Sequence, residues 1–197
     1  MTPSSFIRMA GAAALTLALG ACMDIDMEVD ILSETEAEAT MVTSTAADMY
    51  EMMQAQAVEG DEEFCAEGEI VANGDMIDCT MIQSGPFAEL DFNTAEEGGP
   101  SIEAIGDGQV RVTFPTGELA DAMAEDTGAT DDPQMQAMIT AMFEDRAITM
   151  TVTGGPIVDT NMEMAADGMS ATYEIPFTTL FEGDTGLPPE LYAVVQK

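Results

Sequence analysis

Two residue types are absent from this sequence and positive charge is scarce. Its 197 residues include no histidine and no tryptophan, and 4 lysines and arginines stand against 38 aspartates and glutamates. Without histidine the chain cannot form a Ser-His-Asp triad, an imidazole general base or a histidine metal site. The formal charge of -34 also excludes a nucleic-acid binder that works by charge, since such proteins use clustered cations to displace counterions.

The short motifs of common active sites are missing as well. The sequence has no Gly-x-Ser-x-Gly turn, no phosphate-binding loop with its lysine and no dinucleotide-binding glycine pattern. No acidic pair stands out from the others as a catalytic pair of carboxylates. We therefore expect a protein that is not an enzyme and that has no cofactor. With 46% hydrophobic residues, it is nevertheless too apolar to be a disordered acidic tail.

The N-terminal segment has the features of a secretion signal. Residues 1–8 are polar and end in Arg8, and residues 9–21 form an uncharged run rich in alanine and leucine. A membrane-spanning helix needs about 20 apolar residues, so this run is too short to span a bilayer. It has the length of the apolar part of a signal peptide. We therefore predict that residues 1–21 are a signal peptide.

This run ends in Leu19-Gly20-Ala21-Cys22, which resembles the lipobox of bacterial lipoproteins. The resemblance implies that Cys22 receives a diacylglyceryl group, that cleavage follows Ala21 and that the new N-terminus is acylated, for example with palmitate. Each buried methylene contributes about 0.8 kcal/mol, so several acyl chains would hold the protein on a membrane. An ordinary signal peptide followed by a chance cysteine is the alternative. Met23 follows the cysteine, which leaves the cell membrane and the outer membrane both open, with the protein facing the periplasm or the exterior.

The other two cysteines, Cys65 and Cys79, are an even pair in a chain expected outside the cytoplasm. Such a pair predicts a disulfide bond, and the spacing excludes a redox Cys-x-x-Cys motif. Closing a loop of this length contributes about 3 kcal/mol in the chain-entropy model. Two buried free thiols are the alternative.

Alternating hydrophobic and polar residues predict a sheet made mainly of hairpins. Residues 23–31 alternate without a break, with four acids on one face, and residues 37–43 can pair back on them. Three further hairpins are expected. They cover residues 70–82, with a type I′ turn at Asn73-Gly74, residues 102–114, with a turn at Gly106-Asp107-Gly108, and residues 157–177, with a turn at Asp167-Gly168.

Four segments favour helices. Thr45 has the spacing of a capping box before residues 45–58, and Pro188-Pro189 can start a closing helix. The other two helices are expected over residues 118–125 and 132–143. We therefore predict an α+β fold, with a mainly antiparallel sheet of hairpins and two or three amphipathic helices packed on one face. The length suits a single lipid-anchored domain over residues 22–197.

The order of these elements resembles the LppM-like domain family of bacterial lipoproteins. The resemblance rests on residues 22–53 and 148–177, under half of the chain, and includes Gly154-Gly155-Pro156 and Asn161 between the late strands. Two departures are that no glycine follows Asn161 and that Tyr173 stands where a tryptophan is expected. The resemblance implies an α/β fold, no established catalytic residues, and a role in lipid or envelope-partner interaction.

These observations favour a non-catalytic, lipid-anchored lipoprotein of the cell envelope. Its domain is expected to have an interaction or structural role and to present a strongly acidic surface to an envelope protein partner. The alternative is a periplasmic carrier that binds a lipid or Cu(I) in a methionine-lined pocket, since the sequence holds 18 methionines and thioethers favour Cu(I). On the helical stripes, however, methionine also serves as core filler. The candidate sulfur ligands are Met49, Met52 and Met53, Met135 and Met138, and Met162 and Met164.

Adjacent acids are expected to attract divalent cations without a specific site. The pairs are Glu62-Glu63, Glu96-Glu97 and Asp131-Asp132. The series Asp159-x-Asn161-x-Glu163 lacks the glycine and the final glutamate of a calcium loop, so no metal site is predicted there. Arg111 is expected to neutralise nearby acids.

Overall fold

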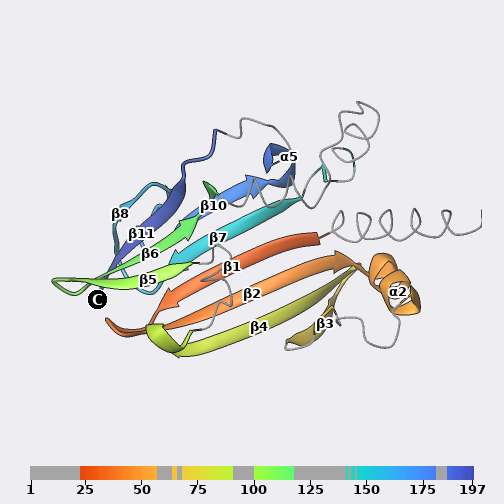
Figure 1. Cartoon of the computed structure of the whole chain (residues 1–197), viewed down its shortest axis with the longest axis horizontal. Coiled ribbons are helices and arrows are strands. Elements are labelled where there is room, and N and C mark those ends of the chain that lie inside the picture. The colour runs from red at the N-terminus through yellow and green to blue at the C-terminus, as the bar shows by residue number, and fades with distance from the viewer. Residues whose placement is uncertain are drawn as a thin grey trace, which may run out of the picture.

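Two β-sheets pack face to face in this protein (Figure 1). The structure is a computed structural model that describes residues 23–56, 64–65, 68–90, 100–117, 141, 143–144, 146–180 and 186–197. Sheet A has seven strands in the order β3-β4-β2-β1-β7-β10-β9, and sheet B has four in the order β5-β6-β11-β8.

The elements have the following bounds. The strands of sheet A are β1 (Met23–Ile31), β2 (Glu36–Ala46), β3 (Glu69–Asn73), β4 (Met76–Pro86), β7 (Ala147–Thr153), β9 (Glu163–Met164) and β10 (Ala171–Pro176). The strands of sheet B are β5 (Ser101–Gly106), β6 (Gln109–Pro115), β8 (Ile157–Thr160) and β11 (Glu190–Gln196). The helical elements are α2 (Ala47–Gln56), the 3-10 turn η1 (Phe87–Glu89) and α5 (Phe177–Leu180).

The strand predicted from the alternating pattern of residues 23–31 is confirmed, because β1 has these bounds. Val29 and Ile31 are fully buried between the sheets, whereas Asp26 and Glu28 point to the opposite face and are exposed. β1 pairs antiparallel with β2, as expected, and parallel with β7. Because period two gives one apolar face and one acidic face, burial of the apolar face fixes the register of the whole sheet.

The hydrophobic core lies between the two sheets and extends along sheet A from Ile31 of β1 to Ile148 of β7 and Ile175 of β10. Strands β6 and β11 contribute alternate residues that are almost fully buried. These are Val110, Val112 and Phe114 from β6, and Leu191, Ala193 and Val195 from β11. They pack against Val29, Ile31 and Val152 from sheet A in one continuous cluster, so the two sheets depend on one core.

Gly154-Gly155-Pro156 carries the chain from sheet A to sheet B. Gly154 has a φ of +105°, and a Cβ there would lie 2.2 Å from the backbone oxygen of Ile31. A Cβ at Gly155 would lie 2.5 Å from the backbone oxygen of Gln196. The Nζ of Lys197 donates to the carbonyl oxygens of Ile31 and Gly154, at 2.8 and 2.5 Å. Glycine therefore allows three strand ends to meet at this crossover.

The predicted α+β class is wrong. In the described part of the chain strands dominate, and the helical elements described in full are α2, α5 and η1, with Gly117 and Ala141 as single helical residues beside segments that are not described. The residues of the expected closing helix instead form β11, which pairs with β6 and β8 inside sheet B. The predicted helix over 118–125 lies outside the described residues, as does that over 132–143 except for Ala141 and Phe143.

Three local predictions are also corrected. Thr45 does not cap a helix: it is fully buried in β2, its hydroxyl has no hydrogen-bond partner among the described residues, and α2 begins only at Ala47. Pairing of Asn73 with Met76 leaves Gly74 and Asp75 in the turn, so no type I′ turn forms at Asn73-Gly74. The expected last hairpin is divided, because β8 joins sheet B while β9 pairs with β10 in sheet A.

Candidate functional site

A cavity of about 750 Å³ lies on the face of sheet A that points away from sheet B. We call it the acidic cavity, because acids dominate its charged lining. The carboxylates are Asp24, Asp26, Asp78, Glu144 and Glu174, and the cation is Arg146.

Strand register brings these distant residues together. Asp24 and Asp26 lie on the polar face of β1, which is the opposite face from Val29 and Ile31. In the parallel pair of β1 and β7, Asp26 is opposite Thr149, and Thr149 is opposite Glu174 of β10. On the other side Asp24 is opposite Ser44 of β2, which in turn faces Asp78 of β4. The acidic face of β1 therefore becomes the floor of the cavity.

Arg146 and Asp24 form the charged pair of this cavity. The Nη1 of Arg146 donates to Asp24 Oδ2 at 2.5 Å, and the Ala147 N–H donates to Asp24 Oδ1 at 3.2 Å. The two side chains are 25% and 30% exposed, so water screens the pair and its stabilising effect is modest. The Arg146 backbone is held in turn, since its carbonyl accepts from Phe177 N–H at 2.9 Å.

The other acids divide into one that is held and three that are free. Asp78 accepts hydrogen bonds from Ser44 Oγ at 2.7 Å and from Asn73 Nδ2 at 3.1 Å. The side-chain carboxylates of Asp26, Glu144 and Glu174 have no hydrogen bond or ion pair to any residue that the structure describes. The cavity thus offers three uncommitted carboxylates around one neutralised pair, which suits a ligand with several positive charges.

Metal binding by carboxylates is not favoured by this arrangement. Among the described residues no group of three or more histidines, cysteines, aspartates or glutamates is placed to hold one metal ion. The carboxylates of the acidic cavity come from β1, β4, β10 and the segment before β7, and carboxylates distributed in this way match an extended cationic group better than a single ion.

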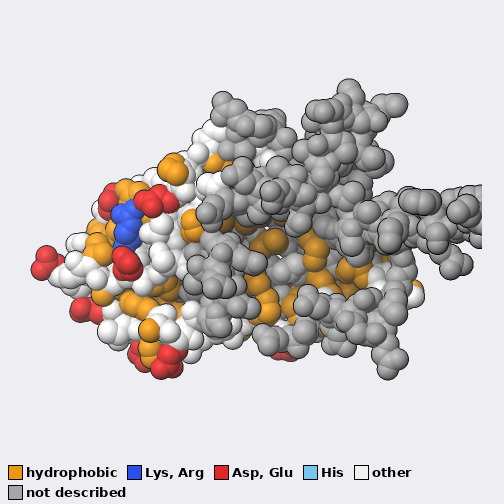
Figure 2. Space-filling view, in the orientation of Figure 1, with side chains coloured by type: hydrophobic (Ala, Val, Ile, Leu, Met, Phe, Trp, Pro, Cys, Tyr) orange, Lys and Arg blue, Asp and Glu red, His pale blue; other side chains and the backbone are white. Residues whose placement is uncertain are grey.

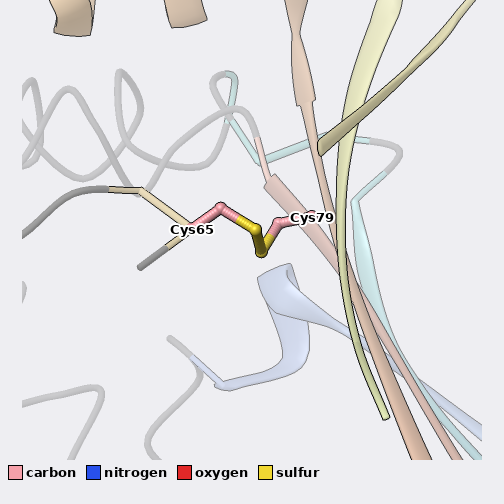
Figure 3. The surroundings of a disulfide bond; sticks show 2 residues. All are labelled: Cys65 and Cys79. Atoms are coloured by element: carbon pink, nitrogen blue, oxygen red, sulfur yellow. A yellow bond between two sulfur atoms is a disulfide. The ribbon is translucent and has the colours of Figure 1, made fainter. Parts of the chain in front are cut away.

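The predicted lipidation site Cys22 lies outside the described residues. The structure does contain the predicted disulfide, with the Sγ atoms of Cys65 and Cys79 2.01 Å apart (Figure 3). Cys79 is buried in β4, so the bond ties residues 64–65 to the hairpin of β3 and β4. The ring of the neighbouring Phe64 packs edge-on against Tyr50 of α2, with 5.7 Å between centroids.

The methionine groups chosen from the sequence do not assemble into one site. On α2, Met49 and Met53 are half-buried while Met52 is 40% exposed. Met162 is buried in the core, whereas Met164 is 45% exposed. Met135 and Met138 lie outside the described residues. Met76 is the one methionine among the residues that line the acidic cavity, so this cavity is not the methionine-lined pocket of the carrier hypothesis.

The remaining candidates have structural roles or lie elsewhere. The prediction that Arg111 neutralises a nearby acid is confirmed, because its Nη2 donates to Glu190 Oε1 at 2.9 Å. The guanidinium also lies 3.8 Å from the centre of the Tyr192 ring. Asn161 is occupied by the backbone of β11, donating to Glu190 O and accepting from Tyr192 N–H. The acid pairs at 62–63, 96–97 and 131–132 lie outside the described residues.

Comparisons with known proteins give the fold and no family. No family model matches the chain, and no curated protein matches it by sequence. The NMR structure of the folded domain of Mycobacterium tuberculosis LppM is similar, with a TM-score of 0.51 and 12% identity over 89% of this chain and 90% of that one. This likeness supports the resemblance to the LppM-like fold. No helix in the described part of the chain is long and apolar enough to cross a membrane.

Proposed function

We propose that this protein is a non-catalytic lipoprotein of the cell envelope. In this proposal its anchor is the acylated Cys22 in the cell membrane or the outer membrane, and its domain faces the periplasm or the exterior. The proposal is supported by the lipobox sequence Leu19-Gly20-Ala21-Cys22 together with the likeness to the folded domain of LppM. The acidic cavity then serves as the interaction surface for a positively charged segment of an envelope protein.

The start of β1 supports a position of the acidic cavity close to the bilayer. β1 begins at Met23, directly after Cys22. An extended chain spans at most about 3.3–3.6 Å per residue, so the Cα of Asp24 would lie within roughly 7 Å of that of the lipidated cysteine. A partner that presents basic residues next to the membrane would meet Asp24, Asp26 and Arg146 at this level.

The anchor is tested by Cys22→Ser. We expect the wild-type protein to fractionate with membranes and to incorporate labelled palmitate, and the variant to do neither, because serine cannot form the thioether. The variant Met23→Ile, which keeps the cysteine and an apolar strand residue, serves as the control and is expected to remain on the membrane. Unchanged fractionation of Cys22→Ser would refute the lipid anchor.

The interaction surface is tested with a tetralysine peptide as the probe. The double variant Asp26→Asn/Glu174→Gln removes two free carboxylates of the acidic cavity, and we expect the dissociation constant to rise about five- to tenfold, since each exposed ion pair contributes about 0.2–1 kcal/mol. The control Glu36→Gln/Asp107→Asn removes two exposed charges outside the cavity lining. Equal weakening in the two variants, measured by titration at fixed ionic strength, would mean that only net charge matters.

A further inference from the structure

Four methionines from four neighbouring strands lie in one row on the face of sheet A that is opposite to the acidic cavity. Met27 of β1 is opposite Met41 of β2 on one side and Met150 of β7 on the other. Met41 is in turn opposite Met81 of β4. We call these four residues the methionine row. Pattern analysis along the chain does not find it, because its members come from different strands and meet only through the register.

The row passes from the core to a half-buried part of the sheet. Met150 is 6% exposed and belongs to the core, and Met27 packs against it. Met41 and Met81 are half-buried and are not part of the core cluster. Figure 2 shows hydrophobic side chains at the surface over β1 and β2, seen from the side on which sheet B lies. Among the described residues, the core cluster therefore includes one end of the row and not the other.

Small or polar side chains flank the half-buried end of the row on this face. On β2, Met41 lies between Ala39 and Thr43, the nearest residues that point to the same face. On β4, Gln83 follows Met81 on that face and is exposed. Neighbouring strands lie about 4.8 Å apart and opposite Cβ atoms about 4.5–5.5 Å apart. Because methionine is unbranched and flexible, the sulfurs of adjacent residues in the row can converge on one atom between them.

The chemistry of the surroundings selects a soft cation. The positions of β1, β2 and β4 that share this face hold no acid, so a hard cation such as Mg²⁺ or Ca²⁺ finds no oxygen ligands of the kind it prefers. The sequence has no histidine, and Cys65 and Cys79 are joined to each other. Thioethers are soft donors that favour Cu(I), and the large negative charge of the chain raises the local concentration of cations.

We propose that Met27, Met41 and Met81 form a binding site for Cu(I), with Met150 closing the row on the core side. This site is independent of the acidic cavity and of the lipid anchor, and it gives the protein a second capacity, that of holding a monovalent soft metal ion by thioether sulfur alone.

The experiment is an anaerobic titration of the purified full chain with Cu(I) in the presence of a competing chelator. We expect one equivalent to bind with a dissociation constant of about 1 μM or below. Met41→Leu/Met81→Leu conserves volume and removes two sulfurs, so its dissociation constant should rise at least tenfold. The control Met164→Leu/Met169→Leu replaces two exposed methionines outside the row and should bind as the wild type does. Absence of micromolar binding, or equal binding by the row variant and the wild type, would overturn the proposal.

A second measurement on the wild type removes any dependence on how the variants fold. Ag(I) serves as the probe, and the methionine methyl resonances are followed by NMR. We expect the methyl groups of Met27, Met41 and Met81 to shift at the first equivalent. Shifts confined to other methionines would refute the site even if the protein binds silver.

Discussion

Replacing Gly154 by alanine should lower the free energy of unfolding by at least about 3 kcal/mol. Two effects add at this residue. Its φ of +105° lies in a region that costs a residue with a Cβ about 1–3 kcal/mol. The added Cβ would also lie 2.2 Å from the oxygen and 2.6 Å from the nitrogen of Ile31. These are backbone atoms of a paired strand, so they cannot move away as a flexible side chain would.

Gly186→Ala is the matched control for this prediction. Gly186 has a φ of +62°, and a Cβ there would meet no atom within 4 Å. It therefore isolates the backbone strain, which we expect to cost about 1–2 kcal/mol. The measurement is denaturant unfolding of both variants. The free energy of unfolding must depend on denaturant concentration with the same slope in both, because only then do the midpoints report stability. Equal losses in the two variants would mean that the close contact of Gly154 with β1 does not limit the packing of the sheets.

Local patterns predict much of the sheet. The strict alternation of residues 23–31 gives β1 with its bounds and its buried face, and the paired cysteines give the disulfide. The glycine-containing turn at 106–108 gives the hairpin of β5 and β6. In each case the information lies within a few residues, because burial of one face fixes the period and a glycine fixes the turn.

The errors have a common physical cause. Residues 191–195 are a continuous apolar run shortly after two prolines, and such a run fits a buried strand or a helix equally well by periodicity. These residues form a strand because they pair with β6 on one side and with β8 on the other. A local sequence pattern contains no information about this pairing. The acidic cavity and the methionine row depend likewise on long-range register, above all on the parallel pairing of β1 with β7. Sequence identifies their residues as strand positions and cannot bring them together.

Removing the disulfide should destabilise the protein by about 3 kcal/mol. Cys65 and Cys79 are 14 positions apart. In the chain-entropy model, a cross-link over a loop of this length lowers the conformational entropy of the unfolded chain, which stabilises the folded state by about 3 kcal/mol. The variant Cys65→Ala/Cys79→Ala leaves no free thiol at either position. Because Cys79 is only 2% exposed in β4, this double replacement also avoids burying an unpaired polar group, which a serine there would do.

Reduction of the wild type provides the control for the disulfide and separates it from the proposed anchor. We expect dithiothreitol to lower the stability of the wild type to that of Cys65→Ala/Cys79→Ala and to leave the variant unchanged, as measured by denaturant unfolding. An acylated Cys22 would be a thioether, which dithiothreitol does not cleave, so membrane attachment should survive the same treatment. If reduction changed the stability of the double variant, the reductant would be acting on another bond. If it released the wild type from membranes, attachment would depend on a disulfide and not on the lipid.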